Sequence, residues 1–98
     1  MYVVVVHDIK DPQTAFARGE KLIRGEGAPA GARGLQFYPS RDGSTVTCLW
    51  EADSVGAIQE YVDSTLGDSS ENTSYEVAAE HAFAERPLGL AASPAVRA

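Results

Sequence analysis

Cysteine is almost absent from this sequence. Cys48 is the only one, so no disulfide can form within the chain, and no cysteine–histidine spacing resembles a zinc motif. Basic residues are also few: 8 Lys and Arg stand against 14 Asp and Glu, and the formal net charge is −6. Because contacts to phosphate need Lys and Arg, this balance predicts neither nucleic acid nor an anionic membrane as a partner.

Long apolar runs and the familiar catalytic fingerprints are missing as well. The opening MYVVVVHD has no basic stretch, and its apolar run is too short for a signal peptide or a membrane span. With one cysteine, these features predict a cytoplasmic protein. The sequence contains no phosphate loop, nucleophile elbow, metalloprotease helix or dinucleotide fingerprint, so the enzyme classes that these motifs define are not indicated.

The length of 98 residues predicts one domain. We expect this domain to occupy residues 1–85. Residues 86–98 are small, apolar and rich in alanine, which predicts a tail that is flexible or that crosses to a partner.

The hydrophobic pattern predicts four strands and two helices. Asp11 and Pro12 suit the start of the first helix, Asp53 or Ser54 the start of the second, and the Asp42–Gly43 pair indicates a hairpin between strands two and three. The expected strands are residues 2–8, 34–40, 44–51 and 72–78, and the expected helices are residues 12–24 and 55–66. This β-α-β-β-α-β order predicts an α+β, ferredoxin-like fold with an antiparallel sheet in the order 4-1-3-2.

Strand alternation sorts the side chains onto two faces of the sheet. The hairpin is expected to place Tyr38 opposite or near Val46, and Gln36 near Cys48. Strand one, antiparallel to strand three, is expected to place His7 near Val46 and Val3 near Trp50. One face is expected to carry Val3, Val5, His7, Gln36, Tyr38, Val46, Cys48 and Trp50, and the other Val4, Val6, Leu35, Phe37, Thr47 and Leu49. The second face is the more purely apolar, so we assign the two helices to it, with Tyr75 and Val77 of strand four. The first face would then lie open, and its apolar area predicts a homodimer, a dimeric α/β barrel with a cavity between the two faces.

Polar groups on the first face make it the candidate site, because ligand pockets combine apolar walls with a few convergent polar groups. We predict His7 and Tyr38 as catalytic candidates and His7 with Glu76 as candidate metal ligands. The predicted ligand-binding residues are Gln36, Cys48, Trp50, Asn72, Ser74 and Glu76. A strand-end histidine without a task, a Glu76 pointing to solvent, and a Cys48 that is only a buried hydrophobe stay open as alternatives.

Residues 45–77, TVTCLWEADSVGAIQEYVDSTLGDSSENTSYEV, together with the opening MYVVVVHDI, resemble small bacterial proteins of the dimeric α/β-barrel superfamily. The unit CLWEA followed by a capped helix is similar to that of nickel-binding and stress-responsive barrel proteins. The resemblance implies a dimer and admits metal binders, haem proteins, polyketide cyclases and cofactor-independent monooxygenases. It implies either a divalent metal such as nickel or no cofactor.

Three functions follow as hypotheses. The first is a homodimer that binds a small molecule or a metal in its cavity. The second is a cofactor-independent monooxygenase or a polyketide-cyclase-like enzyme, with His7 as acid or base and Tyr38 or Asn72 holding an oxyanion. The third is a structural interaction module that uses its tail.

Overall fold

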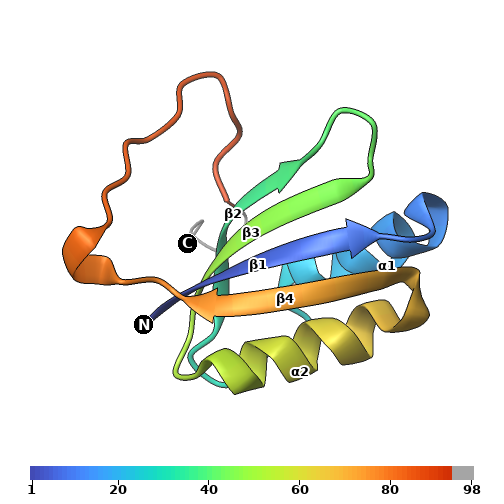
Figure 1. Ribbon diagram of the computed structural model, residues 1–98, viewed down its shortest axis with the longest axis horizontal. Coiled ribbons are helices and arrows are strands. Elements are labelled where there is room, and N and C mark those ends of the chain that lie inside the picture. The colour runs from blue at the N-terminus through green and yellow to red at the C-terminus, as the bar shows by residue number, and fades with distance from the viewer. Residues whose placement is uncertain (94–98) are drawn as a thin grey trace.

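A computed structural model describes residues 1–93 of the chain, and Figure 1 shows its layers. A four-stranded sheet carries two helices, α1 and α2, which pack on one another. The elements are β1 (Tyr2–Ile9), α1 (Pro12–Arg24), β2 (Arg33–Pro39), β3 (Thr45–Glu51), α2 (Val55–Leu66), the short 3-10 turn η1 (Gly67–Ser69), β4 (Ser70–Glu76) and a second turn η2 (Ala79–His81).

The sheet order is β2-β3-β1-β4, and every neighbouring pair is antiparallel. Read from the other edge, this is the predicted order 4-1-3-2. The register between β1 and β3 is also confirmed, since Val3 lies opposite Trp50 and His7 opposite Val46. The molecule is therefore a small ferredoxin-like α+β domain.

Both helices begin at side-chain caps that the sequence predicted. The Asp11 carboxylate accepts a hydrogen bond from the Thr14 amide, and the Ser54 hydroxyl accepts one from the Ala57 amide. At the other end of α1, Gly25 takes the left-handed conformation that ends a helix, with φ at 72°. Local sequence alone thus fixes where the two helices start.

The β2–β3 pairing was predicted one residue out of register near the hairpin. We expected Gln36 near Cys48, but Phe37 lies opposite Cys48, and Tyr38 lies opposite Thr47. The cause is the turn: the Asp42 carboxylate accepts hydrogen bonds from the hydroxyls of Ser40 and Ser44 and from the Ser44 amide, which fixes the shape of the loop over residues 40–44. A bulge between Gly34 and Gln36 restores the expected register further along.

The assignment of the helices to a sheet face was wrong. Val3, Val5, His7, Val46, Cys48 and Trp50 are all buried, and all but His7 belong to one core with Leu22 of α1 and Ile58, Val62 and Leu66 of α2. The helices therefore cover the face that carries His7. The open face presents Tyr2, Val4, Val6, Leu49, Tyr38 and Tyr75 instead.

The prediction assigned the helices to the face with fewer polar side chains. This criterion failed because a polar side chain can be buried in a core when it is hydrogen-bonded. His7 is 2% exposed, yet both ring nitrogens have partners. On β4, the sharing of one face by Asn72, Ser74 and Glu76 with His7 is confirmed, since these three lie opposite His7, Val5 and Val3. Tyr75 was expected on the helix side and lies on the open face, 53% exposed.

After β4 the chain leaves the sheet and returns to the β2 edge (Figure 1). There the Ser93 hydroxyl donates a hydrogen bond of 2.7 Å to the carbonyl of Gly34. Residues 86–93 of the predicted tail are described, whereas residues 94–98 lie outside the described residues. No helix within residues 1–93 is long and apolar enough to cross a bilayer.

Candidate functional site

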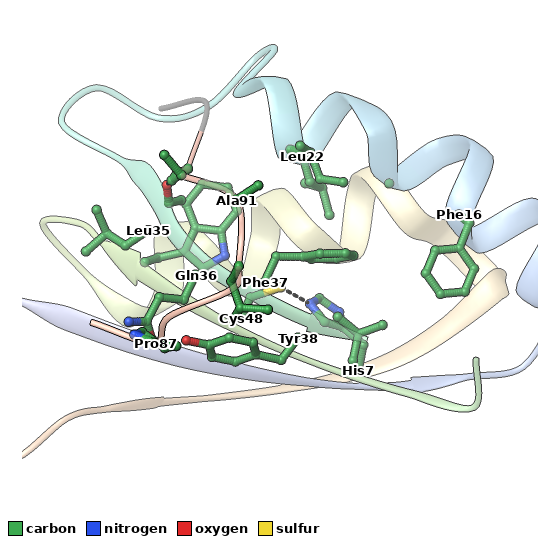
Figure 2. A pocket seen from close by; sticks show the side chains of 18 of the residues that line it. His7, Phe16, Leu22, Leu35, Gln36, Phe37, Tyr38, Cys48, Pro87 and Ala91 are labelled. Atoms are coloured by element: carbon green, nitrogen blue, oxygen red, sulfur yellow. Dashed lines mark hydrogen bonds between the residues drawn. The ribbon is translucent and has the colours of Figure 1, made fainter. Parts of the chain in front are cut away.

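A cavity of about 730 Å³ lies between α1, the β2–β3 half of the sheet and the returning C-terminal segment (Figure 2). Its walls are mostly apolar, and its polar side chains include His7, Gln36, Cys48 and Tyr38. The apolar lining residues include Phe16, Leu22, Ile23, Leu35, Phe37, Val46, Trp50, Leu66, Pro87 and Leu90. This is the size and composition of a site for a small organic molecule.

Uneven helix packing leaves room for this cavity. α2 lies against β4 and β1, while α1 packs mainly on α2 and η1. The helix-facing side of β2 is therefore only loosely covered, and the residue across the gap from α1 is Phe37, which is 40% exposed. The cavity lies within one subunit, on the helix side, and not between two open sheet faces as the sequence analysis expected.

His7 sits in the cavity wall near the end of β1, held at both ring nitrogens. Its Nδ1 lies 2.7 Å from Oδ1 of Asn72, and its Nε2 lies 3.4 Å from Sγ of Cys48. Figure 2 marks the second of these contacts and shows both side chains at the cavity. The pairing of β1 with β3 and β4 brings these three residues together, since Asn72 is directly opposite His7.

The carboxylate of Asp63 determines which way the Asn72 amide points. Asn72 Nδ2 donates to Asp63 Oδ1 at 2.9 Å, and a carboxylate can only accept, so Oδ1 of Asn72 must face His7. Nδ1 of His7 is then the donor. In the neutral ring, Nε2 carries the lone pair, which the Cys48 thiol faces.

Burial controls the ionisation of this pair. Loss of solvent lowers the pKa of His7, against the opposing effects of the Asn72 hydrogen bond and the Asp63 charge. Burial raises the pKa of Cys48 to about 12. The pair is therefore a neutral imidazole beside a neutral thiol at neutral pH.

Asp63 and Gln59, both on α2, are functional residues that the sequence analysis missed. The Gln59 amide donates to both Asp63 oxygens, at 3.1 and 3.0 Å, and to the backbone carbonyl of Asn72 at 2.8 Å. This clamp holds the carboxylate behind Asn72. Their spacing of four residues places them on one flank of the helix, which is a sequence signal, but the sequence did not indicate that β4 lies alongside.

The structure places three more predicted site residues at the cavity: two ligand-binding candidates, Trp50 and Gln36, and the catalytic candidate Tyr38. Trp50 is two residues after Cys48 on the same face of β3, and Gln36 and Tyr38 reach the cavity from the opposite face of β2. The cavity thus extends around the β2 edge. Trp50 is 3% exposed, and its indole N–H has no hydrogen-bond partner among residues 1–93.

Ser74 and Glu76 do not join the cavity. Ser74 is opposite Val5, with a buried hydroxyl that has no partner within the described residues, and Glu76 is exposed at the far end of β4, opposite Val3. Four strand positions therefore separate Glu76 from the register of His7, or roughly 13 Å along the strand. No group of three or more His, Cys, Asp or Glu within residues 1–93 could hold a metal ion, so the described residues do not fit the divalent metal that the resemblance implied.

The comparisons with known proteins support the fold. No protein-family model and no curated protein matches the chain. A solved structure, that of Rv0793 from Mycobacterium tuberculosis, is similar to it with a TM-score of 0.52 and 17% sequence identity, over 83% of this chain and 98% of that one. At this identity the likeness concerns the fold alone, which agrees with a small ferredoxin-like domain.

Proposed function

We propose that the protein binds a small, largely apolar organic molecule in the cavity between α1 and the β2–β3 half of the sheet. The observation that carries the proposal is a single buried imidazole, His7, in a cavity of about 730 Å³ with mostly apolar walls. The apolar walls supply affinity by burial, and the Gln36 amide and the Tyr38 hydroxyl at the β2 edge of the cavity offer hydrogen bonds to a polar atom of the ligand.

Trp50 makes this proposal directly testable, because it is the only tryptophan in the chain and it lines the cavity. We expect 1-naphthol and propiophenone to change its fluorescence in a saturable way. Ile23→Arg places a charge in the cavity wall and should weaken binding at least tenfold, since a charge is costly beside an apolar ligand. Ala17→Arg, an exposed position of α1 away from the cavity, is the matched control. Equal affinity in the two variants would contradict the proposal.

A second candidate function is acid–base catalysis at the same site, in a cofactor-independent monooxygenase or a cyclase-like enzyme. The observation that favours it is the Asp63–Asn72–His7 chain, which presents a neutral imidazole to the cavity as a general base. We expect His7→Gln to lower oxygen uptake with a dihydroxynaphthalene by about 10²–10⁴-fold. Unchanged uptake would remove His7 from this role.

We also propose that two copies associate through the open sheet face. Tyr2, Val6 and Tyr75 are between 38 and 53% exposed on that face, and none of them lines the cavity. A domain of this size gains stability by burying such a surface, and a second copy presents the complementary face by two-fold symmetry. In this arrangement each subunit keeps its own cavity.

A further inference from the structure

Cys48, His7 and Asn72 form a line of thiol, imidazole and amide, in which Cys48 and His7 line the cavity and Asn72 lies behind the ring of His7. Sγ lies 3.4 Å from Nε2, and Nδ1 lies 2.7 Å from Oδ1 of the amide. A nucleophile within reach of a base, with the base oriented by a third group, is the arrangement that activates thiols in covalent catalysis. The binding and acid–base proposals leave Cys48 without a role.

The direction of proton transfer is fixed by the contacts behind the ring. Because the Asp63 carboxylate orients the Asn72 amide, Nδ1 of His7 keeps its proton and Nε2 is free to take the proton from Sγ. Since burial raises the pKa of Cys48 and lowers that of His7, almost no thiolate exists at rest. The thiol must therefore lose its proton to His7 as it attacks.

Trp50 adds a hydrogen-bond donor to the same wall. It follows Cys48 by two residues on one face of β3, is 3% exposed, and has an indole N–H without a partner among residues 1–93. A buried donor left unpaired is costly, and a ligand oxygen would satisfy it. A carbonyl close to the reacting carbon would gain most, because its oxygen becomes negative during the attack.

We propose that Cys48 adds reversibly to an apolar α,β-unsaturated ketone held in this cavity, with His7 as the base. Sγ bonds to the β-carbon, and the alkene electrons move through the α-carbon to the carbonyl oxygen, giving an enolate. The thiol proton passes to Nε2 of His7 and from there to the α-carbon, so the product is a neutral thioether ketone. The step needs no leaving group, oxidant or water, which suits a cavity with mostly apolar walls.

This inference rests on the proposed binding of apolar molecules, so its test separates the two. Phenyl vinyl ketone is the reactive probe, and propiophenone is its saturated analogue, which can bind but cannot react. The full chain is treated with the vinyl ketone, and intact mass reports one adduct on the single cysteine. Cys48→Ser is the blank, and the urea-unfolded chain gives the rate of the free thiol.

The dependence of the adduct rate on pH and the rate of the His7→Gln variant test whether His7 is the base. We expect the adduct rate to be level above the reference histidine pKa of about 6.5 and to fall in acid, because neutral His7 is the base. We expect His7→Gln to slow the reaction by about 10²–10⁴-fold, and His81→Gln, which alters the other histidine on the surface, to leave it unchanged. Asn72→Ala keeps the imidazole but removes its orienting partner, and we expect an intermediate loss.

Three results would overturn the inference. One is a rate that rises tenfold per pH unit through neutrality, as direct attack by thiolate requires. Another is equal rates in the wild type and in a His7→Gln variant whose circular dichroism shows a native fold. The third is that propiophenone changes the Trp50 fluorescence, and so binds, while phenyl vinyl ketone forms no adduct with Cys48. This result would leave the proposed function standing. Failure of both probes to bind would count against the binding proposal as well.

Discussion

At the scale of single residues, the unexpected feature is that a polar histidine and a cysteine lie in the core. The Cys48 thiol contacts Nε2 of His7, and the Asn72 side-chain oxygen is hydrogen-bonded to Nδ1, so both ring nitrogens have partners. The sequence showed all three on one face, and that part of the site was predictable from strand alternation. Their burial was not, because valines occupy both faces of β1 and give no contrast between Val3 and Val5 on one side and Val4 and Val6 on the other.

Burial of His7 makes the stability of the fold depend on pH. The pKa of His7 is lowered by desolvation, so the unfolded chain binds a proton more readily than the folded one. The contribution of His7 to the free energy of unfolding is fully present above the pKa of histidine in the unfolded chain, near 6.5. It is lost as the pH falls from there toward the lower pKa of His7 in the folded chain. The slope within that window reaches at most about 1.4 kcal/mol per pH unit.

This dependence can be measured by urea unfolding at a series of pH values. We expect His7→Gln to flatten the curve in the window just below pH 6.5, where the wild type loses stability. His81 is exposed in η2, so His81→Gln should leave the curve as it is. A His7→Gln curve parallel to that of the wild type would show that another group causes the acid loss.

At the scale of elements, helix ends were predictable and strand pairing was only partly so. Caps act over three or four residues and are visible in the sequence, as at Asp11 and Ser54. The β2–β3 register instead depends on the hydrogen bonds that Asp42 accepts from Ser40 and Ser44 in the loop between the strands. The predicted register was one residue out there, so the prediction put Phe37 on the wrong face of the sheet. Phe37 lines the cavity, and this part of its wall was therefore missed.

The cap of α2 is also a support for the site, because this helix carries Asp63 and Gln59. Ser54→Ala removes the hydroxyl that accepts from the Ala57 amide at 3.1 Å, and we expect a loss of about 1 kcal/mol in the free energy of unfolding. Ser54→Asp keeps an acceptor at the cap and should retain most of the stability. Urea denaturation of the three proteins checks this, and equal losses in both variants would show that the cap bond is not the cause.

At the scale of the whole molecule, the open sheet face and the cavity are different features that meet only at the β2 edge, where Gln36 and Tyr38 lie. The sequence analysis merged them, because it placed His7 on the uncovered face and drew the cavity between two subunits. The fold itself was predictable, since six elements in this order allow few sheet topologies. Which face the helices cover depends on packing across the whole core, from Leu22 of α1 to Trp50 of β3, and no local pattern contains that information.

Separating the two features predicts that association and cavity binding can be altered independently. Val6 lies on the open face, 38% exposed, and is not among the residues that line the cavity. Val6→Asp would bury an unpaired charge from each subunit in the proposed two-fold interface. We therefore expect the dimer to dissociate into monomers in native mass spectrometry. The same variant should still bind propiophenone, because each subunit contains a whole cavity.

Ala17→Asp on α1 is the control and should leave the subunit count unchanged. A wild-type chain that is monomeric at micromolar concentration would remove the interface proposal, whereas a monomeric variant that no longer binds the ketone would show that the cavity requires its partner.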